Sequence, residues 1–411
     1  MSTNEGLEQG EQRVTTLELF FDLVFVFAIT QVSLFFSHDP TWGGLLRGLM
    51  VLAALWWAWS GFAWLTNALD PEEGAIRLAV LAAVAALAIV SLAVPQAFGA
   101  DGVVFGVAYL VVRGLHVALF ARAGRLRDDG ESRPAARALA VTMAAPVLLV
   151  VAGFIDGPSQ LALWVVALAI LYLSPVVGRM RGFRVSPGHF VERFGLIVII
   201  ALGESIVAIG AGAAGLELDA GVIGAALLGV TVSSCLWWSY FDWSTYVSQA
   251  RMVELTGIPR AIFARDAFSY LHLPMVAGIV LFAFGLKTVL PDVTGHLPWV
   301  PAFGLVGGIA LYMAAHVALR LRIGGGWGRG RPVAAAALVV LLPVATVVPA
   351  IAALGMVAAV CVALIVYEFL RHRQERAWIR SHRGGFTMDE AREQLGARDR
   401  GRGVVEDAAD G

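Results

Sequence analysis

A few ionisable side chains lie inside otherwise apolar segments of this chain, and Glu204 is the deepest of them. Glu204 follows Arg193 by eleven residues, close to three helical turns, so the two share one helix face with His189. Helix rise places Glu204 roughly 16 Å from Arg193, near the middle of a bilayer. A carboxylate at that depth must be neutral, paired or exposed to a wet cavity. Glu204 is therefore our first candidate for an ion, proton or substrate site, and the alternative is a buried structural hydrogen bond.

Two acidic residues near the start of the chain, Glu18 and Asp22, are four residues apart and share a helix face. Gln31 lies deeper in the same apolar run, and Ser205 lies beside Glu204. We expect these side chains to contribute to a polar path. For Glu18 and Asp22 the alternative is an anchor at the membrane surface that pairs with a nearby arginine.

A third group, Arg265, Ser269 and His272, has the i, i+4, i+7 spacing of one polar helix stripe. Pro274 follows it, and a proline inside a span frees a backbone carbonyl and kinks the helix. Kinked segments with polar side chains often line cavities in transporters. The stripe is therefore a candidate lining of the same path.

Secondary candidates lie nearer the span ends. His116 and His316 both begin a His-Val-Ala-Leu sequence. A single histidine in an apolar segment is usually a satisfied core residue, whereas a pair can titrate near neutral pH. If the protein were a membrane-embedded enzyme, an interfacial pocket would gather the remaining polar groups, namely Asp22, Arg113, His116, Asp242 and His316.

Composition defines the class of protein. Of 411 residues, 58% are hydrophobic and 15% are charged, whereas soluble domains carry about 25% charged residues. Apolar runs of bilayer length recur throughout, and lipid tolerates only helices or closed barrels. The alternating barrel pattern is absent. We therefore expect an all-α, polytopic integral membrane protein.

The same composition limits partners. The net charge of −1 gives no general attraction to nucleic acid. Cys235 and Cys361 fall in predicted spans, which argues against a disulfide framework or a thiolate metal site. We expect the lipid bilayer as partner, with an ion or small polar solute as a further one, and no metal or cofactor. The oligomeric state does not follow from the sequence.

About twelve spans fit the apolar runs. They fall near 17–36, 45–65, 78–98, 103–120, 139–155, 161–177, 189–209, 220–240, 268–289, 299–319, 333–348 and 351–370. Arginines concentrate in alternate loops and after the last span. The positive-inside rule then places both termini in the cytoplasm.

Three sequence matches in the same order predict an internal duplication. Phe20 pairs with Phe194, Trp56 with Trp237, and His116 with His316. The growing offset indicates longer loops in the second half, including one over 247–264. Six spans per copy would make the copies parallel. The predicted organisation is a polar cytoplasmic N-terminus (1–13), a first six-helix repeat (14–183), a second (184–373) and a partly disordered cytoplasmic tail (374–411).

Several of these segments resemble the bacterial low-temperature-requirement protein A (LtrA) family. They are Glu-Leu-Phe-Phe-Asp-Leu-Val-Phe at 18–25, His-Phe-Val-Glu-Arg-Phe-Gly at 189–195, Gly-Glu-Ser at 203–205, Trp-Ser-Tyr-Phe at 238–241, and His-Leu-Pro at 272–274 with Gly278. The similarity extends from about residue 14 to 373. It implies a bacterial cytoplasmic membrane protein associated with growth at low temperature, and it implies no substrate.

Our leading hypothesis is transport or permeation of an ion or small solute. Glu204 would coordinate the solute or carry a proton, with Arg193 and His272 as neighbours. The alternatives are a lipid-modifying enzyme and a non-catalytic scaffold or sensor. The chain has no Ser-His-Asp order and no His-Glu-x-x-His motif, so an enzyme is the less expected class.

Overall fold

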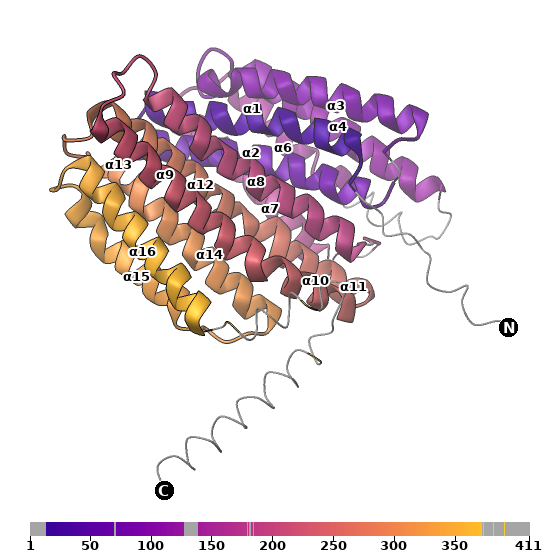
Figure 1. The fold of residues 1–411 in the computed structure, drawn as a ribbon. Helices are drawn as coiled ribbons and strands as arrows, with labels where there is room; N and C mark the ends of the chain where they lie inside the picture. The colour runs from indigo at the N-terminus through magenta and orange to yellow at the C-terminus, as the bar shows by residue number, and fades with distance from the viewer. Residues whose placement is uncertain are drawn as a thin grey trace, which may run out of the picture.

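The computed structural model describes residues 14–69, 71–126, 139–178, 180, 182–183, 185–371, 373, 381 and 390. Within these residues the regular secondary structure is helical, which confirms the all-α class (Figure 1). The predicted N-terminal segment, nearly all of the tail and several loop arginines lie outside the described residues. These arginines are Arg127, Arg133, Arg137, Arg179, Arg181 and Arg184.

Ten helical segments of the described chain are long and apolar enough to cross a membrane, and Leu139–Ala152 and Gly330–Ala345 are shorter apolar helices. Each predicted span coincides with one of these twelve segments. The helices are α1 (Thr16–His38), α2 (Trp42–Thr66), α3 (Gly74–Ala93), α4 (Gly102–Leu126), α6 (Ala144–Ala152), α7 (Pro158–Val177), α8 (Pro187–Gly212), α9 (Ala220–Ser239), α10 (Thr245–Glu254), α11 (Gly257–Ala264), α12 (His272–Val289), α13 (Trp299–Ala302), α14 (Gly308–Ile323), α15 (Gly330–Ala345) and α16 (Ala350–Arg371). The protein is thus a polytopic helical membrane protein.

Short polar signals set where several helices begin. Thr15 accepts a hydrogen bond from the Glu18 amide, and the Glu18 carboxylate accepts one from the Thr15 amide, which forms a capping box for α1. Thr41 caps α2 and Asp219 caps α9, and each side chain accepts a hydrogen bond from one backbone N–H of the first turn. Pro187 occupies the first position of α8, where its missing amide hydrogen costs no helical bond.

The two halves of the chain pack their helices in the same order. In the first half α1 packs on α2 and α3, α3 on α4, α4 on α6, and α7 on α6 and α2. In the second half α8 packs on α9 and α12, α12 on α14, α14 on α15, and α16 on α15 and α9. Figure 1 shows α1–α7 on one side of the bundle and α13–α16 on the other. The duplication stays a prediction with which this packing is consistent.

The halves meet where α1 contacts both α8 and α12. Helix α12 is largely enclosed, since it packs on α8, α14 and α1. Its closest approach to α14 needs two glycines: a Cβ added at Gly278 would lie 2.4 Å from the carbonyl oxygen of Gly308. Small residues let membrane helices approach in this way.

We expect Gly278→Ala to destabilise the folded protein by about 1–3 kcal/mol, the usual cost of overpacking. The added methyl group would meet a backbone oxygen, which cannot move aside as a side chain can. The matched control is Gly210→Ala on α8, where an added Cβ meets nothing within 4 Å. Thermal unfolding of both purified variants checks this, and equal melting temperatures would contradict the close-contact explanation.

One expectation for the second half was wrong. The predicted loop over 247–264 is helical, because α10 buries Val247, Ala250 and Met252 and packs on α8. A π-helical segment over Arg265–Tyr270 lies directly before α12, the helix that contains Pro274. Further π-helical segments lie at Tyr240–Ser244 and Phe303–Gly307. Such segments are frequent at functional sites.

Candidate functional site

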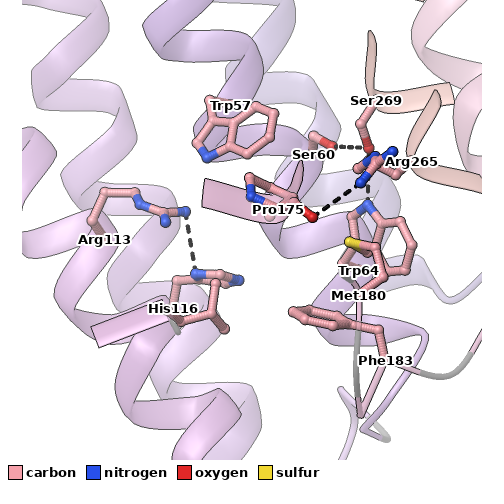
Figure 2. A pocket seen from close by; sticks show the side chains of 12 residues that line it. Trp57, Ser60, Trp64, Arg113, His116, Pro175, Met180, Phe183, Arg265 and Ser269 are labelled. Atoms are coloured by element: carbon pink, nitrogen blue, oxygen red, sulfur yellow. Dashed lines mark hydrogen bonds between the residues drawn. The ribbon is translucent and has the colours of Figure 1, made fainter. Parts of the chain in front are cut away.

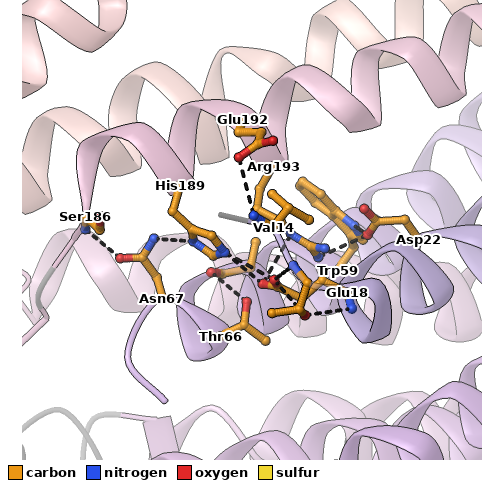
Figure 3. Close-up of polar contacts among 12 residues, drawn as sticks. Val14, Glu18, Asp22, Trp59, Thr66, Asn67, Ser186, His189, Glu192 and Arg193 are labelled. Atoms are coloured by element: carbon orange, nitrogen blue, oxygen red, sulfur yellow. Dashed lines mark hydrogen bonds and ion pairs between the residues drawn. The ribbon is translucent and has the colours of Figure 1, made fainter. Parts of the chain in front are cut away.

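The first polar group joins α1 to α8 (Figure 3). Arg193 Nη2 lies 3.0 Å from Asp22 Oδ1, and Arg193 Nε lies 3.8 Å from Glu18 Oε1. His189 Nε2 lies 3.0 Å from the same Glu18 oxygen. Trp59 of α2 donates its indole N–H to Asp22 Oδ1 at 2.8 Å. All five side chains are buried, so Glu18 and Asp22 of one helix and His189 and Arg193 of another form one enclosed network with Trp59.

Hydrogen-bond donors in this network determine which ring nitrogen of His189 carries the proton. The Ser186 amide donates to Asn67 Oδ1 at 2.6 Å, which leaves the Asn67 Nδ2 group to donate to His189 Nδ1 at 2.9 Å. Because Nδ1 accepts, the ring proton sits on Nε2 and is donated to Glu18. His189 is then neutral, and within the described part of the chain Arg193 is the cation that faces Glu18 and Asp22.

The second polar group holds Glu204 between three helices. Glu204 Oε1 lies 3.0 Å from Lys287 Nζ of α12, and Glu204 Oε2 accepts a hydrogen bond of 2.6 Å from Thr30 of α1. Lys287 Nζ also donates to Ser33 Oγ of α1 at 2.9 Å. Glu204 is 1% exposed. The carboxylate is therefore paired inside the bundle rather than turned toward lipid.

Arg193 and His272 were expected beside Glu204, but neither side chain bonds to it. Arg193 bonds to Asp22 instead, because eleven residues of helix separate it from Glu204. The partner that sequence reasoning missed is Lys287. Its signal is in the sequence, since it is the only lysine of the chain and follows a continuous apolar run.

The third polar group surrounds His272. His272 Nε2 lies 2.8 Å from Tyr240 Oη, and its Nδ1 lies 2.8 Å from the Ala267 carbonyl oxygen. The ring of His316 packs edge-on against Tyr240, and His316 Nδ1 bonds to the Tyr312 carbonyl oxygen at 3.0 Å. Both histidines thus contact the ring of Tyr240 in the core.

The predicted stripe of Arg265, Ser269 and His272 does not form one face. Arg265 and Ser269, just before α12, line a cavity beside α2 and α4 (Figure 2), whereas His272 faces Tyr240. The reason is the π-helical segment over Arg265–Tyr270, whose wider turn displaces the residues after it around the helix axis. Sequence spacing assumes a regular α-helix and does not predict this displacement.

The remaining candidates lie in different places. Ser205 is buried, and its hydroxyl has no hydrogen-bond partner in the described structure. Gln31 is half-buried on α1, and its neighbour Thr30 is the residue that reaches Glu204. Asp242 belongs to the π-helical segment at Tyr240–Ser244. His116 lines the cavity of Figure 2.

The residues named by the enzyme hypothesis have different neighbours in the described chain. Asp22 belongs to the Arg193 network, and Arg113 with His116 lines the cavity. His316 contacts Tyr312 and Tyr240. The hypothesis of one interfacial pocket stays a prediction.

Comparison with known proteins agrees with the residue pattern. A family model described as bacterial low temperature requirement A protein (LtrA) matches residues 13–366. The chain belongs to this family. An uncharacterized protein of Rhizobium meliloti (strain 1021) is 31% identical over 278 residues, which cover 65% of this chain and 67% of the relative. No solved structure matches the chain. The LtrA match includes all three polar groups, and its description names no molecular activity.

Proposed function

We propose that this LtrA-family protein transports an ion or small solute across the bacterial cytoplasmic membrane, and that the Glu204–Lys287 pair couples transport to protonation. The observation that carries the proposal is this ion pair, enclosed where both halves of the chain meet. Ionisable residues placed so deep are costly, and they commonly serve proton relays or substrate pathways.

Protonation of Glu204 has a direct mechanical consequence in this geometry. A neutral carboxyl group loses the charge attraction to Lys287, on the order of 4 kcal/mol for a close pair at an effective dielectric constant near 20. That loss corresponds to nearly a thousandfold change in an equilibrium constant. The pair links α8 to α12, and Thr30 and Ser33 link both to α1. Protonation would therefore loosen the contact between the halves.

Glu204 does not line the cavity of Figure 2, nor a second cavity beside Arg320 and Arg331. Access to the pair would come from a change in the contact between the halves, as in transporters that rock around a central site. The arginine-rich loops support an orientation with both termini in the cytoplasm.

In liposomes with an acidic exterior, purified protein should accumulate a labelled ion or solute from a panel of small ions, carboxylates and amines. Glu204→Gln should reduce this pH-driven uptake at least tenfold, because glutamine cannot carry the proton. Glu217→Gln is the matched control, since Glu217 is an exposed carboxylate outside the helices. Equal uptake by wild type and Glu204→Gln would contradict the proposal.

A further inference from the structure

A cavity of 50 Å³ lies beside α2 and α4, at the end of the bundle where α7 ends (Figure 2). A cavity needs about 10–15 Å³ to hold one water molecule, so this space suits a group of only a few heavy atoms. Trp57, Trp64 and Phe183 provide apolar walls. Figure 2 shows Arg113 and His116 on one side of the cavity and Ser269 with Arg265 on the other.

Arg113 is a buried cation without a counter-charge in the described part of the chain. It is 1% exposed, and its guanidinium donates to Thr142 Oγ1 at 3.1 Å and to His116 Nδ1 at 3.2 Å. Its Nε has no hydrogen-bond partner there. Burying an unpaired charge is costly, so Arg113 requires an anion or a functional reason for its position.

The hydrogen-bonding groups that remain around this cavity are donors. Arginine has no acceptor, so His116 Nδ1 must accept from Arg113, and the ring proton then sits on Nε2. His116 Nε2 is buried, and its only hydrogen bond among the described residues is a weak, poorly aligned one to the backbone of Gly61. It is turned toward Gly61, which lines the cavity and has no side chain to cover it.

The serine pair leaves one more donor. Ser269 Oγ accepts the indole N–H of Trp64 at 2.9 Å and lies 2.9 Å from Ser60 Oγ. Only one of the two hydroxyl protons can lie between these oxygens, so the other is directed elsewhere. Both serines line the cavity.

The charged residues described in the lining of the cavity are both positive. No aspartate or glutamate is among its described lining residues, whereas Arg113 and Arg265 both are. Arg265 pairs with Asp266, and Asp266 is shared with Arg322, so these three residues retain one net positive charge. A site with positive charge and free donors is complementary to an oxyanion.

We infer that this cavity binds one small oxyanionic group, of carboxylate or phosphate size, against the hydrogen-bonded pair of Arg113 and His116. The group belongs either to a free anion or to the headgroup of an anionic lipid. The inference rests on the proposed function at one point only: a free anion bound here would be the transported solute. Binding itself does not depend on transport.

Purified full-length protein in neutral detergent should bind radiolabelled phosphate or acetate saturably, at one site per chain, by scintillation proximity. Arg113→Gln should weaken binding at least tenfold, and Arg113→Lys should weaken it less, because lysine keeps the charge but loses the planar fork. Gly61→Ala should also weaken it, since the added Cβ would lie 3.0 Å from Arg113 Nη1 and 3.2 Å from His116 Nε2. This variant keeps every charge in place.

Arg47→Gln is the control, because Arg47 is a partly exposed arginine that pairs with Asp39 outside the cavity. Nanodiscs of phosphatidylglycerol should compete with labelled phosphate if the group comes from lipid, and phosphatidylcholine nanodiscs should not. Binding is measured in detergent without any transport step, so a failure of transport would not resemble a failure of this site. If wild type binds neither anion and no anionic lipid, or if folded Gly61→Ala binds as wild type does, the inference is overturned.

Discussion

Replacing Lys287 by methionine is expected to destabilise the folded protein by about 3–5 kcal/mol, because Glu204 would keep its buried charge and lose its counter-charge. Glu204 is 1% exposed, and its remaining partner is the hydroxyl of Thr30. A neutral hydroxyl cannot compensate a carboxylate in this setting. Thermal unfolding of the purified variant, at a pH where carboxylates are ionised, measures the effect.

The double variant Lys287→Met with Glu204→Gln provides the control. Removing both charges of a buried pair is often nearly neutral, whereas removing one is costly. We therefore expect the double variant to recover most of the stability that Lys287→Met loses. If the single and double variants were equally stable, the two side chains would not be energetically coupled, and the proposed switch would have no basis.

The second large effect is expected at Arg193. Arg193→Gln leaves Glu18 and Asp22 buried against α8 without their arginine, while His189 is held neutral by Asn67. We expect a loss of about 3–5 kcal/mol and a marked fall in the yield of folded protein. Yield, monodispersity and melting temperature together measure this.

Adding Asp22→Asn to Arg193→Gln should restore part of the folded yield, because one of the two unpaired carboxylates is removed. The control is Glu192→Gln on the adjacent, exposed position of α8. A surface charge of this kind contributes little to stability. An Arg193→Gln protein as stable as the Glu192→Gln protein would show that the network between α1 and α8 is not held by charge.

The helical membrane class could be predicted because lipid imposes a simple requirement on the sequence. Continuous apolar runs long enough to span a bilayer can satisfy their backbone only as helices, so the spans followed from hydropathy. The helices over 247–264 were missed because hydropathy detects only long apolar helices. Its helices α10 and α11 are short and partly polar, and tertiary packing on α8 stabilises α10.

The polar groups were predictable residue by residue, but their partners were not. Helical spacing placed His189, Arg193 and Glu204 on one face, and all three side chains are buried. Spacing within one helix does not tell which helix packs against that face. Lys287 comes from α12, which follows α8 by about 60 residues of chain, and its approach depends on how the halves assemble.

The cavity could be predicted from the sequence even less than the polar groups could. Arg113 and His116 have helical spacing on α4, but Arg265 and Ser269 reach them through the π-helical segment before α12. Trp64 and Ser60 join from α2. A site assembled by an irregular turn and three helices leaves no single motif in the sequence.

The most direct test of the coupling role of Glu204 compares net uptake with exchange in proteoliposomes. Wild type should show both pH-driven accumulation of the labelled solute and its exchange for unlabelled solute at equal pH. Glu204→Gln should lose accumulation and keep exchange, because exchange needs the solute site to change sides without moving a proton. If folded Glu204→Gln accumulates the solute under the pH gradient as wild type does, the Glu204–Lys287 pair does not couple protons to transport.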